Sequence, residues 1–241
     1  LLPLVSWGSL NRIQADRAFA QALVAKNTLE QRVTAMTQAI QKYSRGDVYF
    51  RTFGALQLAQ FQDVLQKKPD GEERQKQLRG LAQDSIIGTR QSTVLNPKSA
   101  ANWQALASVY QQLAPFVEGS EDESVKALEE LRKIEPNNPV HATDLASIYI
   151  GRADRESAVG EKADKTKVSN NQIDAEKFLD QALKLDQGFA PAHFQMAIIE
   201  ERRGKLPQAI ARVEKLAKET PNDLPLAIQL GALYLKNNQA D

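Results

Sequence analysis

The sequence predicts an all-α fold made of helix pairs that stack one after another. Three observations lead to this prediction: a short helical pattern recurs along the chain, a second amphipathic stretch follows most copies, and a proline or its substitute closes each unit. A pattern that returns every few tens of residues is typical of repeat proteins, in which each unit packs on its neighbours. Of the 241 residues, 42% are hydrophobic, which is enough for such a shared core.

The first helix of each predicted unit carries a large apolar residue, directly followed by a small one. A tyrosine usually comes three residues later. A small side chain lets a neighbouring helix approach closely, and an aromatic side chain one turn further fills the space beside it. We therefore expect four packed helices of one kind. Their key positions are Leu106 and Ala107 with Tyr110, Leu145 and Ala146 with Tyr149, Met196 and Ala197 with Glu200, and Leu230 and Gly231 with Tyr234.

A second amphipathic stretch follows the first three of these helices and ends at Pro136, Gln187 or Pro221. Proline cannot continue a helix, so it marks the joint between two units. Counted from Pro97, the joints lie 39, 51 and 34 residues apart. The predicted units are 100–138, 139–189 and 190–223, followed by a half unit at 224–241.

Residues 1–99 are predicted to form an N-terminal region with divergent units. Phe50, Phe53 and Gly54 repeat the order of aromatic, apolar and small residues. We expect one unit at 10–46 and another at 47–99 with unusually long helices. The predicted domains are therefore 1–99 for this region and 100–241 for the regular array.

The 51-residue spacing contains an insertion at 153–172. It consists mostly of charged and small residues and has no apolar period of its own. An isolated loop of this kind is costly to order. Two interpretations stay open: a solvated hairpin extension without a role, or a segment that orders against a partner, since insertions in solenoids often make contacts.

These features resemble the tetratricopeptide-repeat family. The resemblance covers residues 97–241 and implies a right-handed α-solenoid of about five helix pairs plus a C-terminal half repeat. Glu200 stands where an aromatic residue is usual, Gln187 where a proline is, and Ser124 where an alanine is. The best-matching residues are Trp103, Leu106, Ala107, Tyr110 and Pro136 in one unit and Leu230, Gly231 and Tyr234 in the last.

The order of features is also similar to the extracytoplasmic repeat tails of bacterial membrane proteins related to O-antigen ligases and polymerases. An apolar stretch leads into "ADRAFAQAL", and "LNPKSAANWQALASVYQQLAPFVEGSED" follows later. This resemblance implies a module outside the cytoplasm or at the cell surface of a bacterium, with its N-terminus near a membrane. The apolar stretch at 1–7 is itself too short to cross a bilayer, which takes roughly 20 apolar residues.

Composition argues against several classes of function. The 31 Lys and Arg residues balance 30 Asp and Glu residues, so the basic surface typical of nucleic-acid binding is not expected. Cysteine is absent, and the two histidines, His141 and His193, occupy corresponding places in consecutive units, where repeat packing accounts for them. The sequence contains no phosphate-binding loop, nucleophile elbow or metalloprotease motif. We expect no catalytic residue, no cofactor and no metal site.

The family resemblance implies that the first helix of each unit lines a concave groove that binds protein. Units that grip the acidic C-terminal tails of chaperones carry Lys and Asn at these places, and this chain does not. The expected ligand is therefore an apolar partner helix. The predicted groove residues are Gln104, Ser108, Thr143, Ile150, Phe194, Ile198, Ile228 and Leu235.

The half unit at 224–241 has leucines on both sides of its helix, without a second helix to cover them. Solenoids normally cover their apolar stacking face with a polar cap, so some of these leucines should stay exposed. We expect both ends of the chain to contact other copies in a heterologous way, which produces rings or filaments. The predicted residues are Leu1, Leu2, Leu4 and Trp7 at one end and Leu226, Leu230 and Leu233 at the other.

Taken together, the sequence predicts a non-enzymatic scaffold that mediates protein–protein interaction. Its expected partners are copies of itself, in a homo-oligomer or filament, and no nucleic acid. The alternative is an extracytoplasmic accessory module of a membrane glycan-assembly protein similar to the O-antigen ligases.

Overall fold

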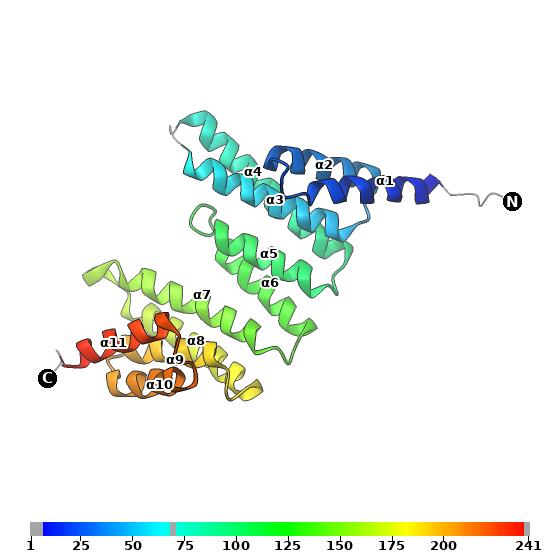
Figure 1. Ribbon diagram of the computed structural model, residues 1–241. Coiled ribbons are helices and arrows are strands. Elements are labelled where there is room, and N and C mark those ends of the chain that lie inside the picture. Colours follow the sequence, from blue (N-terminus) through cyan, green and yellow to red (C-terminus); the bar gives the residue numbers. More distant parts are fainter. Residues whose placement is uncertain (1–6, 68–70, 239–241) are drawn as a thin grey trace. The chain divides into compact units, whose positions relative to one another are not determined.

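The computed structural model describes residues 7–67 and 71–238, with the side chains of residues 7 and 8 left out. Within these ranges the chain forms eleven α-helices and one short 3₁₀ turn, with no strand (Figure 1). The predicted all-α class is therefore confirmed. No helix in the described part is long and apolar enough to cross a membrane.

The helices fall into two compact units, residues 1–134 and residues 135–241. The first unit contains α1 (Trp7–Ala22), α2 (Leu29–Lys42), α3 (Asp47–Gln66), α4 (Glu72–Leu95), α5 (Ala100–Leu113) and α6 (Ser120–Ile134). The second contains α7 (Pro139–Ser157), the 3₁₀ turn η1 (Gly160–Lys162), α8 (Lys165–Leu185), α9 (Ala190–Arg202), α10 (Leu206–Glu219) and α11 (Leu224–Asn238).

Consecutive helices pack in pairs. In the first unit α1 packs on α2, α3 on α4 and α5 on α6, and in the second α7 packs on α8 and α9 on α10. The last helix, α11, packs on α10 and is followed by no further described helix. The described part of the chain therefore contains the predicted five helix pairs and a final half repeat. The predicted domain boundary at 99/100 lies between α4 and α5, which contact each other inside the first unit. This boundary separates the divergent units from the regular repeats, and it stays a prediction.

Local sequence signals explain where several helices begin. Thr28 and Gln31 form a reciprocal capping box at the start of α2, with hydrogen bonds of 3.2 and 3.0 Å. Asn138 caps α7 by accepting from the backbone N–H of Val140, and Asp164 caps α8 in the same way. Prolines stand in the first turn of α7, α9 and α10, where the missing N–H costs no hydrogen bond.

The apolar–small pairs lie at the helix contacts, as their spacing requires. Leu106 and Ala107 are at most 5% exposed, and so are Leu145 and Ala146. The same position in α3 is Gly54, whose carbonyl accepts a hydrogen bond of 2.8 Å from the buried Ser85 hydroxyl on α4. These contacts join the two helices of each pair closely.

The insertion at 153–172 is mostly helical. The helix α7 continues to Ser157, η1 makes the turn, and α8 begins at Lys165. Continuing both helices satisfies backbone hydrogen bonds that an irregular loop would leave to water. Near its end Gln172 is buried and accepts a hydrogen bond of 3.1 Å from Arg203 on the next helix pair.

Candidate protein-binding site

A cavity of about 580 Å³ lies between α3 and α5 in the first unit. Two of the predicted groove residues line it: Gln104, which is exposed, and Ser108, which is half-buried. Their role in binding a protein stays a prediction. Most of the other lining side chains are small or apolar, and none carries a charge. The full lining is Ala55, Leu58, Ala59, Gln62, Thr89, Ala101, Gln104, Ala105, Ser108, Val109 and Gln112.

Glutamine amides form the polar rim of this cavity. The Gln62 amide on α3 donates to the Gln112 side-chain oxygen on α5 at 2.6 Å. The Gln112 amide in turn donates to the Ser108 hydroxyl at 2.9 Å. Each glutamine can make more hydrogen bonds than these, because a primary amide has two donor hydrogens and an acceptor oxygen. The rim can therefore bind the polar backbone of a peptide while the small residues admit an apolar side chain.

A buried polar network fixes the helices around the cavity. The Asn102 side chain is fully buried and donates to the Asp47 carboxylate and to the Ser92 carbonyl, both at 2.9 Å. Its oxygen accepts from Arg51 at 2.8 Å. These bonds join α3, α4 and α5. Although partial burial acts in the opposite direction, the hydrogen bonds from Asn102 and Asn96 lower the pKa of Asp47.

The other predicted groove residues do not share this site. Thr143 and Ile150 on α7 are buried, and Phe194 and Ile198 on α9 are half-buried in apolar clusters of the second unit. Phe194 also lines a smaller cavity of about 300 Å³. Only the last two predicted groove residues, on α11, point freely into solvent: Ile228 is 64% exposed and Leu235 is 66% exposed.

The final helix α11 has one covered and one open side. Leu226 and Leu233 are buried in a cluster with α10 residues, and Leu230 is half-buried against the same cluster. The exposed large aliphatic residues of α11 are Leu224, Ile228 and Leu235 instead. At the other end of the chain, the predicted contact residues Leu1, Leu2 and Leu4 and the Trp7 side chain lie outside the described residues.

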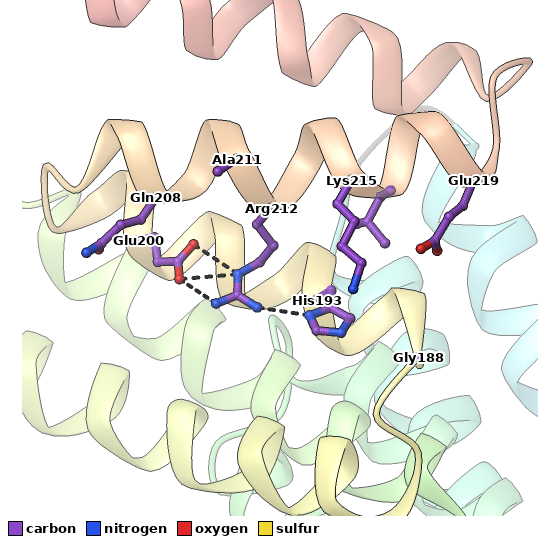
Figure 2. A pocket seen from close by; sticks show the side chains of 9 residues that line it. Gly188, His193, Glu200, Gln208, Ala211, Arg212, Lys215 and Glu219 are labelled. Atoms are coloured by element: carbon purple, nitrogen blue, oxygen red, sulfur yellow. Dashed lines mark hydrogen bonds and ion pairs between the residues drawn. The ribbon is translucent and has the colours of Figure 1, made fainter.

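A second cavity, of about 590 Å³, lies beside α9 and α10 and contains His193 (Figure 2). Arg212 donates to the Glu200 carboxylate at 3.0 and 2.7 Å and to His193 Nδ1 at 2.9 Å, while His193 Nε2 lies 2.8 Å from the Gln187 carbonyl. These partners assign the neutral tautomer with its proton on Nε2. The network explains Glu200 at the usual aromatic position: its charge pairs with Arg212 on the second helix.

The other histidine also has a packing role. His141 is 4% exposed, and its Nε2 lies 2.7 Å from the Glu135 carboxylate. Hydrogen bonds to His141 and Asn138 lower the pKa of Glu135. In the described part of the chain, no three side chains of His, Cys, Asp or Glu gather closely enough to hold a metal ion.

Register alone could have identified more of the cavity. Gly54 in α3 takes the position that Ala107 takes in α5. This alignment places Ala55 and Ala59 on the groove side of α3, but the predicted groove residues begin only at α5. The pairing of Glu200 with Arg212 was also missed, although an unusual carboxylate at an aromatic position is a signal for a basic partner. No sequence signal pointed to Asn102, which stands next to Trp103 in an ordinary amphipathic stretch.

Comparisons with known proteins agree with this geometry. No family model matches the sequence, and no curated protein matches it. A tetratricopeptide-repeat protein from Parabacteroides merdae matches with a TM-score of 0.66 at 17% identity, covering 92% of this chain and 73% of that one. A thermophilic tetratricopeptide-repeat protein from Thermus thermophilus gives 0.55 at 15% identity, covering 92% and 99%. MamA from Desulfovibrio magneticus gives 0.57 at 12% identity, covering 90% and 98%. With helix pairs, small-residue contacts and these matches in agreement, the chain has the tetratricopeptide-repeat fold.

Proposed function

We propose that this protein is a non-enzymatic scaffold that binds other proteins, with the cavity between α3 and α5 as its binding site. The observation that carries the proposal is the combination of small residues in the cavity with a glutamine rim that has hydrogen-bonding capacity to spare. The lining has no charged side chain, so a segment of a partner that presents an apolar residue and its backbone suits the cavity best.

Selection from a phage-displayed random peptide library tests this proposal. The variant Ala55→Trp places a large side chain at the cavity, and because Ala55 is exposed the fold should tolerate it. The matched control is Ala20→Trp, which changes an exposed alanine on α1, away from the cavity. Peptides selected on the unchanged protein should bind the control and lose binding to Ala55→Trp. Equal binding to both variants would remove this cavity from the proposal.

The same scaffold is proposed to assemble with copies of itself. Support comes from the exposed apolar side chains of α11 and from Leu10 and Ile13 on α1, which are 42% and 47% exposed. Covering such side chains is favourable by roughly 1.5–3 kcal/mol for each fully exposed one. Light scattering at rising protein concentration should give a growing mass. A constant monomer mass would contradict self-assembly and leave the peptide site untouched.

A second candidate function is an accessory module of a membrane glycan-assembly system outside the cytoplasm of a bacterium. The exposed Leu10 and Ile13 on the first helix support a location near an apolar surface. The test is the encoding gene: this function requires membrane-spanning sequence upstream of Leu1, and a start codon directly before Leu1 would argue against it.

A further inference from the structure

Another cavity of the first unit combines an apolar surface with an arginine. It has a volume of about 310 Å³ and is lined by residues of α3, of α4 and of the turn at 114–119 that connects α5 to α6. We call it the Phe116 cavity. Its apolar part consists of Phe61, Leu78, Ala82, Phe116 and Val117, and its polar part of Gln75 and Arg79. It shares no lining residue with the cavity between α3 and α5.

The turn between α5 and α6 presents an accessible aromatic ring to this cavity. Phe116 is 52% exposed, whereas the other phenylalanines of the described chain are buried or half-buried. Its ring centroid lies 5.2 Å from that of the buried Phe61, with 68° between the ring planes. This edge-to-face contact holds Phe116 in place and leaves part of its surface to solvent. An apolar side chain of a ligand can therefore displace water from the Phe116 ring.

The phenylalanine stands in a connection that is longer than the repeat needs. The joints around α5 and α6 lie 39 residues apart, against 34 for the unit that contains α9 and α10. The backbone N–H groups of Phe116 and Val117 both donate to the Leu113 carbonyl at 2.9 Å, so the turn has a defined conformation. Additional residues in repeat proteins gather on one face, which often binds partners. Joining two helices does not by itself require an exposed phenylalanine.

Arg79 differs from the two other arginines of α4. Arg74 donates to the Val64 carbonyl at 3.0 Å and connects α4 to the end of α3. The Arg90 guanidinium lies 3.5 Å from the Glu123 carboxylate on α6. Arg79 is exposed, and within the described part of the chain its side chain makes no hydrogen bond or ion pair. Because a guanidinium is a planar fork of donors that matches a carboxylate, Arg79 can bind a carboxylate of a ligand.

The arginine and the apolar surface lie side by side. Gln75, Leu78, Arg79 and Ala82 are spaced three, one and three residues apart, which places them on one face of α4. The exposed Gln75 stands one turn before Arg79, and its amide can donate to the same carboxylate. Within the described lining, Arg79 is the only charged residue, so no carboxylate of the cavity competes for it. The Phe116 cavity therefore suits a ligand that carries an apolar group close to a carboxylate.

The turn also indicates which kind of carboxylate fits. Chain-terminal carboxylates are commonly bound by free backbone N–H groups, whereas acidic side chains are recognised by arginine. The N–H groups of Phe116 and Val117 are already occupied by the Leu113 carbonyl. The cavity thus offers the side-chain donors of Arg79 and Gln75, which favours an acidic side chain within a chain over a chain end.

We propose that the Phe116 cavity binds a segment of a partner protein in which a large apolar side chain and an Asp or Glu side chain face the same way. The apolar side chain packs on Phe116 and Leu78, and the carboxylate pairs with Arg79. In an extended segment the two residues stand two positions apart, because alternate side chains lie on the same side. This surface is separate from the cavity between α3 and α5 and adds a second contact to the proposed scaffold.

Titration with three short peptides, followed by NMR of the backbone amides, tests the inference. Each peptide is acetylated, amidated and built of serines, with phenylalanine in second place and glutamate, glutamine or lysine in fourth place. The glutamate peptide should shift the amide signals of Leu78, Ala82 and Val117. It should bind about fivefold more tightly than the glutamine peptide, the upper range for an exposed ion pair, and the lysine peptide should bind most weakly.

Two charge-matched variants show whether Arg79 reads the carboxylate. Arg79→Gln should bind the glutamate and glutamine peptides equally, with the affinity for the glutamine peptide unchanged. Lys76→Gln removes the same charge from an exposed residue of α4 outside the cavity lining and should keep the preference for glutamate. Phe116→Ser should weaken the binding of all three peptides. Circular dichroism checks that each variant keeps its helix content.

Several results would overturn the inference. Equal affinities for the three peptides, or a preference for glutamate that survives in Arg79→Gln, would contradict the role of Arg79. Amide shifts confined to residues outside the Phe116 cavity would contradict its location. A peptide that ends in phenylalanine with a free carboxylate, if it bound more tightly than the blocked glutamate peptide, would contradict an internal segment. Ala55→Trp should leave these titrations unchanged, so failure here is distinguishable from failure of the proposed function.

Discussion

The helices α3 and α11 carry a glycine at the same position, the eighth residue of each helix, in opposite surroundings. Gly54 in α3 lies against α4, and an added Cβ would come within 2.7 Å of the Ser85 carbonyl oxygen. Gly231 in α11 has open space at that point. The same sequence feature therefore marks a tight helix contact in one region and an unfilled contact in the other. The difference is that α4 packs against Gly54, whereas no described atom would lie within 4 Å of a Cβ added at Gly231.

This comparison shows what a small residue means in a repeat. It permits a close approach, but it does not bring a partner helix. In the complete units the partner comes from the same chain, and the small residue is buried, as Ala107, Ala146 and Ala197 show with exposures of at most 2%. At α11, among the described residues, no atom lies close to the small position at Gly231.

The largest difference in stability between α5 and α11 is expected when the leucine directly before the small residue is truncated to alanine. Leu106→Ala removes a 5% exposed side chain of α5 and should lower the free energy of unfolding by about 2–5 kcal/mol. Leu230→Ala removes a half-buried side chain, so it should cost less than half as much. Urea unfolding followed by circular dichroism measures both. Equal losses would show that α11 is packed as completely as α5.

Exchanging glycine for alanine at the two equivalent positions should change the free energy of unfolding in opposite directions. Gly54→Ala forces a methyl group against the backbone of α4 and should destabilise by about 1–3 kcal/mol. Gly231→Ala meets no atom of its own chain and should stabilise α11 by about 0.5–1 kcal/mol, because alanine loses less backbone entropy in a helix. Urea unfolding gives the first value. Hydrogen exchange of α11 amides, at a concentration where the mass is monomeric, gives the second. A loss at both positions would contradict the open space at Gly231.

The smallest expected effect concerns two tyrosines that both donate to a carboxylate. Burial and the hydrogen bond to Asp16 raise the pKa of Tyr49 to about 12. Because this pKa is above the ordinary value of 10.0, the stabilisation is complete below pH 10.0 and is lost as the pH rises toward 12. Tyr49→Phe should remove this alkaline loss, which urea midpoints measured across the pH range would detect.

Tyr234 on α11 also donates a hydrogen bond to a carboxylate, so it serves as the comparison for Tyr49. Its hydrogen bond to Glu214 raises its pKa, but the side chain is 41% exposed, so Tyr234→Phe should barely change the stability at any pH. Ultraviolet titration of tyrosinate follows both groups. If Tyr234→Phe altered the alkaline unfolding as much as Tyr49→Phe, the contrast between the two regions would be wrong.

Part of the candidate site was predictable because repeat register assigns sides of a helix. Gln104 and Ser108, which the family resemblance assigns to a groove, both line the cavity between α3 and α5, and their role in binding stays a prediction. Thr143 has the register of Gln104 and is nevertheless buried, since register cannot tell what packs over a position. Asn102 was missed for a related reason: two of its four hydrogen-bonding partners, Asp47 and Arg51, lie 55 and 51 residues away in the sequence.

The sequence by itself determined the helices and their pairing, because apolar spacing, capping residues and prolines act within a few residues of each other. It also determined that α11 is apolar on two sides. Only the tertiary structure decided which side is covered: Leu226 and Leu233 face α10, and Ile228 and Leu235 face solvent. A side chain is buried only where another element packs on it, and the sequence of one helix does not show which of its faces that element covers.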